Sequence, residues 1–162
     1  MPEARQIVIN TGPIIALVAG TGSLDVLKFL YGTIYVPFEV KQEIVVRNAT
    51  MFGAAEFQAA EWLTLIDVKT RLSPFLRNSL DIGEAAVIQT ALDKGVQTVC
   101  IDEAVGRRVA RLNGLSVTGS IGVLVRAKSL GYPVDVLGAI ERMRSKGVWV
   151  SDRVVQSVKG LV

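Results

Sequence analysis

Short apolar runs that suit buried strands alternate along this chain with segments of helical pattern. The runs expected to form strands are Gln6–Asn10, Thr33–Val36, Trp62–Val68, Gln97–Ile101 and Leu115–Val117. Such alternation favours an α/β fold in which mainly parallel strands are joined by right-handed helical crossovers. A length of 162 residues suits one compact domain. We therefore expect a single domain over 1–162, with its core at about 6–150 and a C-terminal helix at 151–160.

The segments between these runs carry helix start and stop signals. Helices are expected at Pro13–Gly20, Leu24–Leu30, Pro37–Val45, Ala54–Glu61, Asp81–Asp93, Ala104–Leu112, Ile121–Leu130, Val134–Ser145 and Ser151–Lys159. The segment 72–79 gives no clear signal. Val148–Val150 is expected to be extended, with Trp149 either packing on the core or contributing to a dimer or partner surface.

No segment has the character of a membrane anchor or an export signal. The longest apolar runs, such as Ile14–Ala19, fall well short of the roughly 20 residues that a membrane span needs. The N-terminus leads into the first strand without the apolar region of a signal peptide. We therefore expect a cytoplasmic protein. The net charge of +3 only weakly favours an anionic partner.

The chain contains no histidine. This excludes catalysis by Ser-His-Asp or Cys-His groups and zinc sites with histidine ligands. The single cysteine, Cys100, excludes an internal disulfide and is expected to be a buried apolar residue. A hydrolase of this composition would depend on carboxylates, hydroxyls, amides and basic groups, most simply around a hard divalent cation.

Polar residues follow two of the expected strands directly. The first strand ends at Asn10-Thr11 and the fourth at Asp102-Glu103. The functional crevice of an open α/β sheet lies beyond the carboxyl ends of its strands, which makes these residues site candidates. Asp102 equally suits an N-cap for the helix at Ala104, and Glu103 an ordinary acid in its first turn.

Two further acids have both a structural and a functional interpretation. Asp81 and Glu84 have the spacing of a capping box, although Glu84 in the first helical turn also suits the crevice beside Asp102. Glu43 has the spacing to pair with Arg47 on a solvated helix face. Taken one at a time, these acids leave both interpretations open.

The motifs follow one another in a specific order. They are Asn10-Thr11, Val36-Pro37-x-x-Val40-x-x-Glu43-Ile44, Leu80-Asp81-x-Gly83-Glu84-Ala85-Ala86-Val87-Ile88, Ile101-Asp102-Glu103-x-x-Gly106-Arg107, and Leu115-x-Val117-Thr118-Gly119-Ser120. Over roughly residues 6–150 this order resembles the PIN-domain family, in its prokaryotic branch. The Gly-Glu-Ala helix start and the late Val-Thr-Gly-Ser turn are the more specific parts.

The resemblance implies a five-stranded parallel sheet in the order 3-2-1-4-5, with helices on both sides. It also implies a metal-dependent ribonuclease that uses Mg²⁺ or Mn²⁺ and is, in many members, the toxin half of a toxin–antitoxin pair. The family's metal-binding acids match Glu43, Glu84 and Asp102, its first acid falls on Asn10, and its neighbouring hydroxyl falls on Thr11. Asp81 and Glu103 are possible supporting ligands.

Asn10 departs from the family pattern. Its carbonyl oxygen is able to ligate a cation but brings no charge. Two functions therefore remain open: an endoribonuclease, or a weakened module that binds RNA or a protein without cleavage. A receiver-type phosphotransfer domain would need an acid at the first strand end and a lysine after the last strand, and the chain has neither.

Basic and hydroxyl groups near the acids suggest contacts to the substrate phosphate. Arg107 and Arg111 share one helix face, and Thr118 and Ser120 lie in the turn before the next helix. The alternative for the arginines is a solvated basic face. No aromatic RNA-reading motif is present, so no sequence-specific reading of bases is predicted. The expected partners are RNA, an antitoxin protein and a second copy of the chain.

Overall fold

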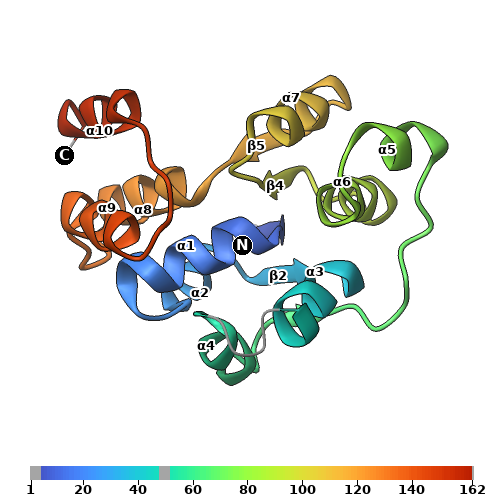
Figure 1. Cartoon of the computed structure of the whole chain (residues 1–162), viewed down its shortest axis with the longest axis horizontal. Helices are drawn as coiled ribbons and strands as arrows, with labels where there is room; N and C mark the ends of the chain where they lie inside the picture. Colours follow the sequence, from blue (N-terminus) through green and yellow to red (C-terminus); the bar gives the residue numbers. More distant parts are fainter. Residues whose placement is uncertain (1–4, 48–51, 162) are drawn as a thin grey trace.

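The structure, a computed structural model, describes residues 5–47 and 52–161. Five parallel strands form one sheet in the order β3-β2-β1-β4-β5 (Figure 1). The strands are β1 (Gln6–Ile9), β2 (Thr33–Val36), β3 (Thr64–Leu65), β4 (Thr98–Cys100) and β5 (Ser116–Thr118). The predicted α/β class and strand order are confirmed.

Helices cover both faces of the sheet. Their bounds are α1 (Thr11–Thr21), α2 (Asp25–Leu30), α3 (Phe38–Gln42), the π-helix η1 (Glu43–Arg47), α4 (Ala54–Ala59), α5 (Pro74–Ser79), α6 (Ile82–Lys94), α7 (Ala104–Leu112), α8 (Ser120–Ser129), α9 (Val136–Ser145) and α10 (Asp152–Lys159). One group of helices in mutual contact contains α1, α2, α8 and α9, and another contains α3, α5, α6 and α7 (Figure 1). This is the expected three-layer arrangement.

The central strand β1 sits in the middle of the core. Ile7, Val8 and Ile9 are fully buried, because β1 is paired on both edges and covered on both faces. Cys100 at the end of β4 is also buried, as expected for a small apolar residue. The carboxyl ends of β1 and β4 therefore lie side by side, and Asn10 N–H donates to Cys100 O at 3.1 Å.

The best-delimited predicted helix, α6, has the expected ends. The Asp81 carboxylate accepts a hydrogen bond from Glu84 N–H at 2.9 Å, and Gly95 ends the helix in a left-handed conformation. Three other elements differ from expectation. The third strand is shorter than Trp62–Val68, because this edge strand pairs with β2 over two residues only. The segment 72–79 contains α5, which is capped by Ser73. The helix after Pro37 widens into the π-helix η1.

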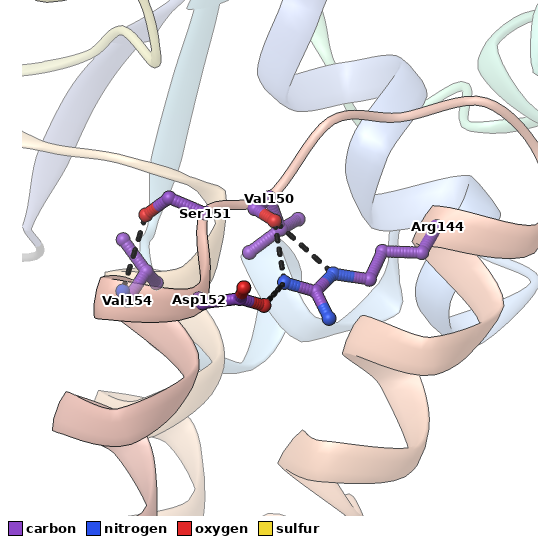
Figure 2. A network of polar contacts seen from close by, with 5 residues as sticks. All are labelled: Arg144, Val150, Ser151, Asp152 and Val154. Atoms are coloured by element: carbon purple, nitrogen blue, oxygen red, sulfur yellow. Dashed lines mark hydrogen bonds and ion pairs between the residues drawn. The ribbon is translucent and has the colours of Figure 1, made fainter.

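Polar contacts hold the segment between α9 and α10, and the Trp149 side chain does not (Figure 2). Arg144 donates to Val150 O at 2.6 Å and to Asp152 at 2.9 Å, and the Ser151 hydroxyl caps α10. Trp149 is 85% exposed, so the expectation that it packs on the core is wrong. In the described part of the chain, no helix is long and apolar enough to cross a membrane.

Candidate active site

The end of β1 delivers two polar side chains to the carboxyl edge of the sheet. Asn10 takes the N-cap position of α1 with extended backbone, yet within the described residues its side chain makes no capping hydrogen bond. The Thr11 hydroxyl donates to Glu43 Oε2 at 3.0 Å. The Asn10 side-chain amide is therefore not used to cap α1. The hydrogen bond from Thr11 orients the Glu43 carboxylate.

Three oxygen atoms converge above Gly83 in the first turn of α6. The point where a Cβ on residue 83 would lie is 3.2 Å from Asn10 Oδ1, 3.3 Å from Glu43 Oε2 and 3.6 Å from Asp81 Oδ1. We call this arrangement the Gly83 cradle. Any side chain at position 83 would fill it, so glycine is needed for space and not for backbone conformation.

Glu84 follows the cradle residue and is almost completely buried, with 5% of its surface exposed. Its carboxylate lies over Gly106 of α7: a Cβ there would stand 3.2 Å from Glu84 Oε1. Burial, followed by the negative charges of Asp81, Glu103 and Glu43, raises the pKa of Glu84 to about 7. A cation at this position would relieve that repulsion and favour the ionised form.

Asp102 at the end of β4 serves as a cap for a helix. Its Oδ1 accepts from Ser120 N–H at 2.7 Å, and its Oδ2 accepts from the Ser120 hydroxyl at 2.9 Å. The capped helix is α8 and not α7, whose N-cap residue is Glu103. The proposed cap at Ala104 is therefore wrong. The reason is tertiary: β5 lies beside β4, and so α8 begins next to the Asp102 carboxylate.

Arg107 and the Asp102 carboxylate both approach Gly119. A Cβ on Gly119 would meet Asp102 Oδ1 at 2.6 Å and Arg107 Nη1 at 2.9 Å. Arg107 Nη1 also donates to Ile101 O at 2.9 Å, which holds the guanidinium at the end of β4. Among the suggested phosphate contacts, Arg107 is thus a basic side chain held at the end of β4.

The other suggested phosphate contacts have different surroundings. The amide and hydroxyl of Ser120 are both engaged by Asp102. Arg111 is exposed on the surface of α7, and Thr118 lines a separate cavity. Arg47, the suggested partner of Glu43, has a side chain that lies outside the described part of the structure.

The cavity that Thr118 lines has a volume of about 980 Å³. It lies largely at the amino ends of the strands, away from the acids. Its lining comes mainly from strand starts and adjacent loops, including Arg5, Gln6, Thr33, Thr98 and Ser116. No aspartate or glutamate is among its lining residues. Open α/β sheets bind their ligands at the carboxyl ends of the strands. We therefore assign the candidate active site to the acids and not to this cavity.

The donor set of the Gly83 cradle suits a hard cation. The Gly83 cradle brings together two carboxylates and one amide oxygen, and oxygen ligands are those that Mg²⁺ and Mn²⁺ prefer. Across residues 5–47 and 52–161, however, no three acidic or cysteine side chains already close on a single point. The residues therefore fit such an ion if carboxylate oxygens and the amide oxygen of Asn10 bind it together.

Sequence reasoning gave no physical role to Gly83, Gly106 and Gly119. Gly83 makes room for the cradle oxygens, Gly106 for Glu84, and Gly119 for the side chains of Asp102 and Arg107. A usable signal exists for Gly83 and Gly106. Both lie in the first turn of a helix, where glycine is a poor helix former, but Gly12 of α1 is equally helical and has no neighbour within 4 Å of its Cβ point. The signal therefore indicates positions to inspect and does not identify a crowded one.

Comparison with known families agrees with the fold. A family model described as a PIN domain matches residues 6–162. The match spans nearly the whole chain, and the chain belongs to the PIN-domain family. A comparison with curated proteins found no match. PIN domains have a nuclease-like fold, generally use divalent metal ions and commonly bind RNA.

Proposed function

We propose that this chain is a metal-dependent endoribonuclease that hydrolyses RNA phosphodiester bonds, and that it is the toxin component of a toxin–antitoxin pair. One observation carries the proposal. Oxygen atoms of Asn10, Glu43 and Asp81 lie around the Cβ point of Gly83, next in sequence to the buried Glu84. They lie at the edge of the sheet where Asp102 follows the neighbouring strand β4.

In this proposal Glu43, Glu84, Asp102 and Asn10 hold Mg²⁺ or Mn²⁺, with Asp81, Glu103 and Thr11 in support. The ion would supply a water molecule that is nucleophilic at neutral pH and would shield the charge of the scissile phosphate.

The protein's own hydrogen bonds prepare this arrangement. The Thr11 hydroxyl fixes the direction of the Glu43 carboxylate, and Ser120 fixes that of Asp102. The Arg107 guanidinium, held by Ile101 O, would neutralise charge on the phosphate.

The test is cleavage of labelled single-stranded RNA in Mn²⁺, Mg²⁺ or EDTA. We expect cleavage that requires the metal and falls at least a hundredfold in Asp102→Asn. Asparagine keeps an acceptor for Ser120, so the loss would not arise from uncapping α8. Asp152→Asn is the matched control, because Asp152 is a solvated acid on α10. Equal residual activity in the wild type and Asp102→Asn would contradict the proposal and indicate a contaminating nuclease.

Asn10 favours a second candidate function, a PIN-type module that binds RNA or a protein partner without cleaving. The uncharged amide leaves one acid fewer around the cradle, and in the described part of the chain no three acids converge. A metal titration separates the two candidates. The nuclease binds Mn²⁺ at concentrations that support cleavage, whereas the module binds RNA equally well in EDTA.

We also propose a cytoplasmic location, a homodimer and an antitoxin protein as a partner. The family resemblance supports the antitoxin partner. The exposed Trp149 supports an interaction surface near the C-terminus, because an indole so open to water gains from being covered by another chain.

A further inference from the structure

A small pocket adjoins the Gly83 cradle. Its volume is about 200 Å³, and it is lined by Phe38, Glu39, Gln42, Glu43, Lys69 and Ile82. Glu43 belongs to both the pocket and the cradle, and Ile82 stands between the cradle residues Asp81 and Gly83. The pocket and the candidate active site are therefore continuous.

The pocket is held open by contacts between α3 and the loop that follows β3. Thr70 N–H and the Thr70 hydroxyl donate to the two oxygens of Glu39, each at 2.8 Å. Lys41 Nζ lies 3.3 Å from Asp67 Oδ1 on the same pair of segments. The loop carrying Lys69 is thus fixed before any ligand arrives, and both oxygens of Glu39 are already bonded.

The lining groups suit a flat aromatic ligand with polar edges. Phe38 offers an aromatic ring, and Ile82 an exposed aliphatic surface. Gln42 is able both to donate and to accept hydrogen bonds. The volume is below the roughly 300–1,000 Å³ of pockets that enclose drug-sized ligands, so a single ring system fits better than a whole nucleotide. Lys69 adds a positive charge to the lining, and such a charge suits a phosphate group.

We propose that this pocket holds the nucleobase beside the scissile phosphate of a single-stranded RNA. Phe38 is the stacking platform, Ile82 covers the other apolar side, and Lys69 contacts the adjoining phosphate. This assignment rests on the proposed function, because that function places the RNA backbone at the Gly83 cradle.

The test measures binding with cleavage switched off. Fluorescence anisotropy in EDTA compares a labelled oligoribonucleotide with an oligomer of the same sugar–phosphate length that lacks bases. Base–aromatic stacking predicts that Phe38→Ala weakens binding of the RNA about tenfold and leaves binding of the abasic oligomer unchanged. Phe38→Tyr should restore the difference. Phe75→Ala, which removes an exposed phenylalanine on α5, should change neither affinity.

Two results would overturn the inference. In the first, Phe38→Ala weakens binding of the RNA and of the abasic oligomer equally, as a folding defect would. In the second, it weakens binding of neither, as expected for a pocket that receives a protein side chain. Cleavage in Mn²⁺ is scored separately. If base-dependent binding through Phe38 is found without cleavage, the pocket stands and the nuclease proposal fails. If cleavage is found without base dependence, the nuclease proposal stands and the pocket assignment fails.

Discussion

The carboxyl group of Glu84 makes folding stability depend on pH. An acid with a raised pKa is protonated in the folded chain at pH values where it is already ionised in the unfolded chain. In the absence of metal, the contribution of Glu84 to stability is therefore most favourable below its unfolded pKa, near 4.5, and falls as the pH rises toward about 7. Above that pH the full penalty remains, unless a cation compensates for it.

Glu84→Gln should accordingly stabilise the metal-free protein, and more so at alkaline pH. We expect its advantage in unfolding free energy over the wild type to grow by about 2 kcal/mol between pH 5 and pH 8. Urea unfolding in EDTA at the two pH values measures this. An advantage that does not change with pH would show that like-charge repulsion and burial do not govern this group.

Asn10→Asp tests whether position 10 belongs to the ion site. A fourth acid should tighten Mn²⁺ binding about tenfold and increase cleavage, because it adds charge where an amide oxygen already faces Glu43. In EDTA the same change should cost about 1 kcal/mol of stability through repulsion. Calorimetric titration and urea unfolding provide the two readouts. If neither metal affinity nor cleavage rises, Asn10 is not a ligand.

At the scale of helices, the start of α6 combines a structural cap with functional space. Gly83→Ala should preserve folding to within about 1 kcal/mol, because alanine has the higher helix propensity. Its methyl group would nevertheless press on Asn10 Oδ1 and Glu43 Oε2, and Mn²⁺ affinity should fall more than tenfold. Gly12→Ala in α1 is the matched control, since nothing lies within 4 Å of its Cβ. Undiminished metal binding in Gly83→Ala would argue against the cradle.

The elements also show what sequence reasoning can reach. The start of α6 was predictable because its cap, Asp81, and its stop, Gly95, are local signals. The strand order came from family resemblance and not from the apolar pattern. The capping of α8 by Asp102 was missed because its partner, Ser120, is brought near only when β4 and β5 pair. The oxygen cluster above Gly83 depends in the same way on contact between α3 and α6.

At the scale of the whole molecule, Trp149 gives a test of self-association. If the proposed homodimer uses the surface near the C-terminus, Trp149→Ser should weaken the dimer at least tenfold, because buried tryptophans dominate such interfaces. Leu112→Ser on α7, also highly exposed, should leave the dimer unchanged. Sedimentation equilibrium gives both constants. A monomeric wild type, or equal effects of the two variants, would contradict this surface.

Asp102 accepts two hydrogen bonds from Ser120, and this structural role does not depend on the activity. An acceptor at position 102 is needed for α8 to begin where it does, whether or not an ion is ever bound. A descendant that lost turnover would still be selected to keep this acid or its amide, whereas Asn10 and Glu84 would be free to drift. The presence of Asp102 alone is therefore a poor marker of a working nuclease, and Asn10 and Glu84 are the positions to inspect.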